Sequence, residues 1–174
     1  MDIEHYVQLI LAFVHDHEAW TLPIVFALAF GESLAFISLL VPATVALVGI
    51  GALIGASGTD FVPIWIAAAL GAAAGDWLSY WFGVTFKGAV AHIWPLSRRP
   101  DLLERGHRFV ERYGLYAVFL GRFLGPLRAI VPLVAGILVM PSLKFQIANF
   151  SSAFLWAAVL LAPGSFGLKF LHLA

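Results

Sequence analysis

The chain has 174 residues, of which 61% are hydrophobic and 11% charged, with a mean hydropathy of +0.94. Soluble domains carry about 25% charged residues, so the composition excludes an ordinary soluble enzyme and predicts a chain that folds in a bilayer. Ten Lys and Arg balance ten Asp and Glu, and there is no cysteine. We therefore expect no nucleic-acid partner, no disulfide and no thiol chemistry.

The first residues predict a short helix that does not cross the membrane. Residues 3–15 are apolar with interspersed polar positions, and a crossing needs about 20 residues, so we expect an interfacial or short tilted helix. The start of the sequence has no basic segment and no cleavage site, which predicts that no signal peptide is removed. No polar linker divides the chain, so we expect one membrane domain over residues 1–174.

The next apolar segment has an unusual length. Residues 21–57 are apolar for 37 residues, interrupted by Glu32 and Pro42, which is too long for one crossing and short for two with a turn. This length predicts a re-entrant hairpin whose tip lies near Pro42, because proline cannot donate to the helix ladder. Residues 61–86 then predict a full crossing that contains Asp76.

A basic loop follows the first crossing. Residues 87–113 hold six of the ten Lys and Arg against three acids, which predicts a cytoplasmic location. Within it, residues 102–113 predict an amphipathic helix on the membrane surface, whose basic face would anchor to lipid headgroups.

The second half of the chain resembles the first in its pattern of apolar segments. Residues 114–140 are apolar for 27 residues, broken by Arg122, Gly125-Pro126, Arg128 and Pro132, and predict a second re-entrant hairpin. Residues 145–162 predict the last span, which we expect Pro163 to close.

An internal repeat connects the two halves. A shift of 90 residues superposes Gly31-Glu32 on Gly121-Arg122 and Val41-Pro42 on Val131-Pro132. A hairpin returns to its own side and a crossing changes sides, so two units of hairpin plus crossing must be inverted relative to each other. The sequence therefore predicts an all-α integral membrane protein of two inverted repeats, an architecture that places a substrate site near the midplane in transporters.

The charges inside the apolar segments are the candidate site. Each costs at least about 2.5 to 3.5 kcal/mol at bilayer depth, so Glu32, Asp76, Arg122 and Arg128 are expected to form a buried quartet facing one cavity. Two arginines beside the Gly125-Pro126 break and its free backbone N–H groups would bind phosphate. A carboxylate held beside them could exchange a proton for an anionic ligand. Glu32 and Asp76 are therefore the predicted proton-coupling residues.

A purely structural role remains the alternative for the quartet, because buried ion pairs can serve to fix one fold. A charge swap of Glu32→Arg with Arg122→Glu would then restore function. We expect Trp77, Tyr80 and Trp81 to form an aromatic belt at the membrane interface. Asn149 is expected to bond between helices, with the cavity as its other possible environment.

Chemistry other than transport has little support in the sequence. The six histidines are scattered without metal-ligand spacing, so we expect no metal and no cofactor. Hydrolase and ATP-binding motifs do not occur, and no nucleophile and base are paired, so an intramembrane enzyme is a distant third alternative.

These motifs resemble the DedA family of membrane proteins, over roughly residues 20–160 and in the same order. The residues that carry the resemblance are Phe30-Gly31-Glu32-Ser33, Val41-Pro42, Gly71-x-x-x-Gly75-Asp76, Arg112-Tyr113-Gly114, Gly121-Arg122-Phe123-x-Gly125-Pro126-x-Arg128 and Ala135-Gly136. The resemblance implies two opposed re-entrant hairpins and proton-linked movement of anionic lipids such as undecaprenyl phosphate in a bacterial inner membrane. It implies that the essential acids are Glu32 and Asp76 and the essential arginines Arg122 and Arg128.

Two features depart from the family pattern. Many members carry an acid near the first hairpin tip, where this chain has Leu39-Leu40-Val41-Pro42-Ala43-Thr44, so the proton stoichiometry does not transfer. The sequence also ends soon after the last span, and a homodimer is one arrangement that would supply the missing cover. The interpretation that follows is a multi-pass flippase for a polyprenyl phosphate or phospholipid, with a non-transporting scaffold as the alternative.

Overall fold

The fold is helical throughout the part of the chain that a computed structural model describes, which comprises residues 18–34, 60–87, 89, 97, 100–125 and 127–171, with side chains between residues 20 and 163. Predictions for residues 3–15 and for the hairpin tip near Pro42 lie outside the described residues. The helices are α2 (Glu18–Ser33), α4 (Phe61–Phe86), α5 (Pro100–Tyr113), α6 (Leu115–Gly121), α7 (Leu127–Ile137) and α8 (Ser142–Leu171).

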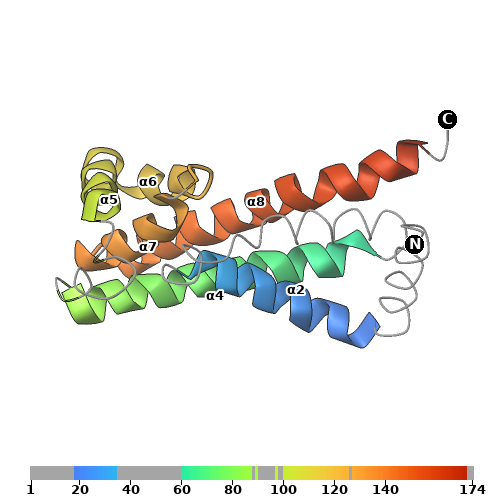
Figure 1. Cartoon of the computed structure of the whole chain (residues 1–174), viewed down its shortest axis with the longest axis horizontal. Coiled ribbons are helices and arrows are strands. Elements are labelled where there is room, and N and C mark those ends of the chain that lie inside the picture. The colour runs from blue at the N-terminus through green and yellow to red at the C-terminus, as the bar shows by residue number, and fades with distance from the viewer. Residues whose placement is uncertain are drawn as a thin grey trace.

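Two long helices, α4 and α8, extend along the longest axis of the molecule (Figure 1). Helix α2 packs along one part of α4 and helix α7 along another, while α5 and α6 lie together near one end. Two apolar clusters result. One joins α2, α4 and α8, and the other joins α7 to α5, α6 and the start of α8.

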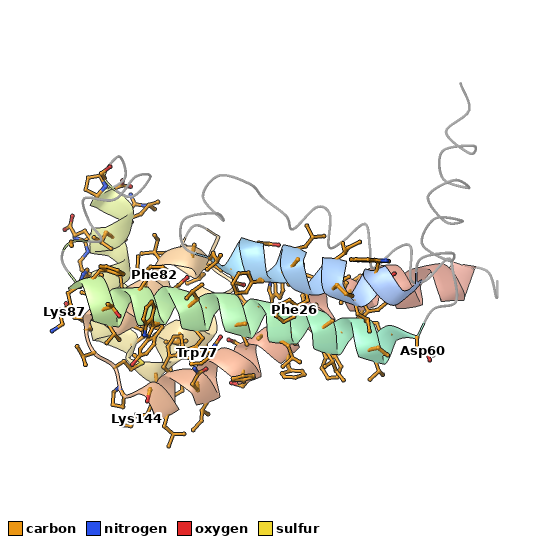
Figure 2. All side chains as sticks on the ribbon, turned by 90° about the horizontal axis from the view of Figure 1, so that it is seen from below. Phe26, Asp60, Trp77, Phe82, Lys87 and Lys144 are labelled. Carbon is orange, nitrogen blue, oxygen red and sulfur yellow. The ribbon has the colours of Figure 1, made fainter. Side chains whose placement is uncertain are left out.

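The outer surface of the long helices is apolar. Exposed large side chains include Trp77 on α4 and Leu143 on α8, at 57% and 73% exposure. Charged side chains lie at the ends of these helices, as Figure 2 shows for Asp60, Lys87 and Lys144. By length and composition, Phe61–Phe86 and Ser142–Pro163 can each cross a membrane, while Trp20–Ser33 and Leu127–Ile137 are shorter apolar helices.

Close backbone contacts fix the position of α4 against its neighbours. A Cβ atom at Gly75 would lie 2.8 Å from the Cβ of Ser33, and one at Gly71 would overlap the carbonyl of Phe26. Further along α4, a Cβ at Gly83 would overlap the carbonyl of Leu133 in α7, and one at Gly136 the carbonyl of Tyr80. Gly71 and Gly75, which lie four residues apart, therefore allow close packing of α2 on α4, and Gly83 with Gly136 does the same for α7.

The helix predicted over residues 61–86 is confirmed as α4, which is long and apolar enough to cross a membrane, and the predicted amphipathic helix is α5. Its buried residues Leu102, Gly106 and Val110 follow a spacing of four residues and face α7 and α6. The segment predicted as the second hairpin consists of two short helices, α6 and α7, separated by a turn around Arg122 and Gly125. Pro126 lies outside the described residues.

Two expectations about single residues were wrong. Helix α8 continues through Pro163 to Leu171, because a proline removes only one hydrogen bond from a long helix. Helix α7 likewise continues through Pro132, and the chain breaks before α7, around Gly125, where the sequence predicts a break. Tyr80 is buried rather than part of a belt: its hydroxyl donates to the Met140 carbonyl and its ring stacks on Phe145.

Candidate functional site

The four charges predicted from the apolar segments are buried together where α2, α4, α7 and the turn after α6 meet. Their exposed fractions are 4% for Glu32, 3% for Asp76, 3% for Arg122 and 8% for Arg128. They form two ion pairs, one between Arg122 and Asp76 and the other between Arg128 and Glu32. Charges inside an apolar protein are stable only when they are paired, and each of these four charges has a partner of opposite sign.

Arg122 is held by directional bonds to two helices. Its Nη2 donates to a carboxylate oxygen of Asp76 in α4 and, at 2.7 Å, to Oδ1 of Asn149 in α8. Its Nε donates to the Ser152 hydroxyl at 3.0 Å. Asn149 in turn donates from Nδ2 to the Ala73 carbonyl at 2.9 Å, which joins α8 to α4. Arg122 is therefore one member of a network across the centre of the molecule.

Arg128 has a different set of neighbours. Its Nη1 donates to Oε1 of Glu32 at 2.7 Å, and its Nη2 donates to the Ser33 hydroxyl at 3.2 Å. The guanidinium carbon lies 4.0 Å from the centre of the Trp156 ring, which is a cation–π contact. Two directional bonds to α2 and one ring face from α8 therefore hold this arginine.

The backbone around Arg128 favours an anion. Arg128 is the second residue of α7, where the helix dipole and the first-turn N–H groups attract negative charge. Gly125 provides the left-handed turn conformation, with φ of 49°, that lets the chain enter α7.

Three buried polar atoms of the cluster have no hydrogen-bond partner among the described residues, namely Oδ1 of Asp76, Nη1 of Arg122 and Nε of Arg128. Two are donors on arginines and one is a carboxylate acceptor. A buried polar atom without a partner costs about 1 to 3 kcal/mol. An anion with several acceptor oxygens is the type of ligand that satisfies both free arginine donors at once.

The structure brings Glu32, Asp76, Arg122 and Arg128 together, with direct ion pairs between Arg122 and Asp76 and between Arg128 and Glu32. Gly125 lies in an exposed turn, and no contact described for this part of the chain joins its backbone to the carboxylates. The pairing also corrects the choice of charge swap, because the partner of Glu32 is Arg128 rather than Arg122. Among the described residues, no group of three or more His, Asp or Glu is placed to hold a metal.

Sequence analysis missed three residues of the site: Ser33, Ser152 and Trp156. Ser33 follows Glu32 directly, so its hydroxyl was a predictable neighbour. Ser152 and Trp156 lie three and seven residues after Asn149, a spacing that puts all three on one face of a helix. That stripe of polar and aromatic residues was the available signal.

Comparison with known proteins identifies the family. The VTT domain family matches residues 41–166, which is most of the chain. The chain belongs to the VTT domain family, also called DedA. The predicted resemblance to the DedA family is therefore confirmed at the level of the family.

Curated relatives from bacteria extend this membership in the DedA family. The chain is 36% identical over 153 residues to inner membrane protein YabI of Escherichia coli, which covers 87% of the chain and 60% of the relative. It is 32% identical to an uncharacterized membrane protein of Buchnera aphidicola subsp. Acyrthosiphon pisum, covering 88% of the chain and 60% of that protein. With inner membrane protein YghB of Escherichia coli the identity is 33%, covering 81% and 65%.

The chain spans about three fifths of the length of YabI and of the Buchnera aphidicola protein. No solved structure matches it.

Proposed function

We propose that this protein is a proton-linked transporter of anionic lipids in a bacterial inner membrane, where it moves a polyprenyl phosphate or phospholipid headgroup past Arg122 and Arg128. The observation that carries the proposal is the pair of buried Arg–carboxylate contacts in a protein with an apolar exterior. Such a cluster is expensive in a bilayer and marks a substrate or proton pathway.

The chemistry of the cluster supports an anionic substrate. Each arginine already has a carboxylate partner, so an arriving phosphate must compete with Glu32 or Asp76. Protonation of that carboxylate would release its arginine for the phosphate, and this exchange couples the ligand to a proton. Glu32 and Asp76 are therefore the proposed proton-coupling residues, and the two arginines are the proposed phosphate ligands.

The topology supports a transporter in the same way. Helix α2 packs on α4 and helix α6 on α8, so in each proposed repeat the helix before the break contacts the crossing of its own unit. The exposed lysines Lys87 and Lys144 lie at one end of the molecule together with helix α5, which carries three arginines and three acids (Figures 1 and 2). The positive-inside rule assigns that end to the cytoplasm. Two relatives are named inner membrane proteins, which agrees with the proposed location in that membrane.

The test is flipping of a labelled polyprenyl phosphate in proteoliposomes, with and without an imposed pH gradient. We expect the rate to follow the gradient and to fall at least about tenfold in Arg128→Ala, because a charge-assisted hydrogen bond contributes about 1.5 to 3 kcal/mol. Arg108→Ala is the matched control, since Arg108 makes an exposed ion pair with Glu104 on α5. If the wild type behaves as empty liposomes do, this substrate is wrong.

The alternative is a non-transporting scaffold in which the charges only lock the fold. The test is a charge swap within each ion pair of the structure. The two double variants are Glu32→Arg with Arg128→Glu, and Asp76→Arg with Arg122→Glu. A lock needs only opposite charges, so both swaps should restore the phenotype of the wild type. For a transporter, the swaps should restore folding while transport stays lost, because the positive charge then lies on a different helix.

A further inference from the structure

We infer that Trp156 is a positioning residue of this site, which keeps the Arg128 guanidinium in place when the bond between Arg128 and Glu32 opens. The inference rests on the proposed function and deepens it, since it assigns the exchange of carboxylate for phosphate to the Glu32–Arg128 pair. The Asp76–Arg122 pair then keeps the helices together during the exchange.

The contact itself carries the first step of the argument. Trp156 is buried at 5% exposure, and its ring centre lies 4.0 Å from the guanidinium carbon of Arg128. Tryptophan is the aromatic residue that binds cations best, and the attraction strengthens when water is excluded. The ring attracts the cation whichever anion occupies the edge of the guanidinium. Trp156 therefore holds Arg128 both with Glu32 and without it.

The ring is itself fixed in the core. Trp156 belongs to the apolar cluster that joins α2, α4 and α8, where its neighbours are mostly alanines and valine. A rigid aromatic ring loses little freedom when it makes a contact. It therefore supports Arg128 from a position that does not depend on the charged residues.

The Asp76–Arg122 pair is less able to exchange its carboxylate for an anion. To exchange its carboxylate, Arg122 would have to leave a network in which Asn149 and Ser152 also accept its protons. Arg128 has one further directional partner, the Ser33 hydroxyl at 3.2 Å, beside its carboxylate. Fewer directional bonds must therefore break for an anion to reach Arg128 than to reach Arg122.

Side chains on one face of α8 contact both Arg122 and Arg128. Asn149 and Ser152 face Arg122, and Trp156, one turn further along the helix, faces Arg128. Hydrogen-bond acceptors thus fix one arginine, while a ring face leaves the edge of the other available to a ligand. This difference assigns the ligand exchange to Arg128.

The decisive experiment does not depend on transport. A single 5-fluorotryptophan is placed at position 156 by site-specific incorporation, and its 19F resonance is measured in nanodiscs for the wild type, Glu32→Gln and Arg128→Gln. We expect Arg128→Gln to shift the resonance clearly and Glu32→Gln to shift it by less than half as much. If both variants shift it equally, Trp156 does not hold Arg128 without Glu32, and the inference is overturned.

A matched probe at position 65 gives the control. Trp65 is a partly buried tryptophan packed against the same apolar cluster, but its ring meets Phe154 edge to face and its Nε1 donates to the Phe154 carbonyl at 2.8 Å. Its resonance should not respond to Arg128→Gln. A response there as large as at position 156 would mean that the core rearranges as a whole, which also overturns the inference.

Transport gives the second readout. Flipping of labelled polyprenyl phosphate should stay within a few-fold of the wild type in Trp156→Phe and fall by roughly tenfold or more in Trp156→Leu, which has no ring. Increasing fluorination of the ring at position 156 weakens the cation–π attraction at nearly constant volume, so the rate should fall stepwise along that series. A flat series in a folded protein contradicts the inference. A wild type that moves no lipid refutes the proposed function instead, and the 19F comparison still decides the role of Trp156.

Discussion

The two buried ion pairs have the same chemistry and different surroundings. Arg122 and Asp76 belong to a network with Asn149 and Ser152, in which every contact is directional. Arg128 is held by Glu32, one serine hydroxyl and the face of Trp156. The neighbours of each arginine therefore decide whether its guanidinium is fixed in place or able to exchange partners.

The largest expected effect comes from removal of Arg122. Arg122→Ala leaves Asp76 buried without its charged partner, and breaking a buried pair costs about 3 to 5 kcal/mol. The free energy of unfolding should fall by that amount, measured by SDS titration in mixed micelles with tryptophan fluorescence. A loss below about 1 kcal/mol would show that the network does not hold the helices together.

Conservative replacement of the two arginines by lysine sharpens the comparison. Arg122→Lys keeps the charge but cannot reach Asp76, Asn149 and Ser152 together, so we expect a loss of about 1.5 to 3 kcal/mol in unfolding free energy. Arg128→Lys can still contact Glu32 and the face of Trp156, and should lose less. The same titration measures both variants, and the reverse order would contradict the division between a fixed and an exchangeable pair.

A smaller effect is expected at Ser33. Ser33→Ala removes one hydrogen bond from Arg128, which should lower the free energy of unfolding by about 1 kcal/mol. Because the bond also competes with a ligand for Nη2 of Arg128, the same variant should bind a labelled polyprenyl phosphate at least as tightly as the wild type. Binding is measured by titration in nanodiscs. Weaker binding would mean that the Ser33 hydroxyl contacts the ligand, rather than bonding Arg128 only when no ligand is bound.

The smallest expected effect lies outside both pairs, at the end of α7. The N–H of Met140 donates to Ala135 and that of Val139 to Gly136, a helix-ending motif in which glycine normally occupies the position of Val139. Val139 has a φ of 52°, which is strained for a β-branched residue. Val139→Gly should therefore raise the free energy of unfolding by up to about 1 kcal/mol.

Leu138→Gly is the matched control for this prediction. Leu138 precedes Val139, and its N–H closes the last turn onto Val134. Its φ is not among the positive values found in the described residues. Glycine there should lower the unfolding free energy, so equal effects at the two positions would rule out strain at Val139.

The sequence predicted α4 and the four charges because both depend on simple energetics. A long apolar run must cross or be buried, and a charge inside it must find a partner. The position of the second break was also predictable, since Gly125 and its neighbours cannot continue a helix. The prediction for α8 failed at Pro163, because one missing hydrogen bond does not end a long helix.

The pairing of the charges was beyond the sequence. Which arginine meets which acid depends on how α2 and α7 pack on α4, and the contacts that set this are between backbones at Gly75, Gly83 and Gly136. The role of Trp156 was missed for the same reason, because a tryptophan in an apolar span looks the same whether it faces lipid or an arginine. Only the rotation of α8 about its axis distinguishes the two.

The contact between α4 and α7 has a mechanical consequence. At Gly83 and Gly136 the two backbones touch, because neither residue has a side chain to hold them apart. Separation of the helices would expose this closely packed backbone, whereas a shift of one helix along the other meets no side-chain ridge at these two glycines. Any motion that carries Arg128 should therefore be a slide along α4 rather than an opening away from it. Because the chain has no cysteine of its own, pairs introduced along this contact would record such a slide as a change in cross-linking register.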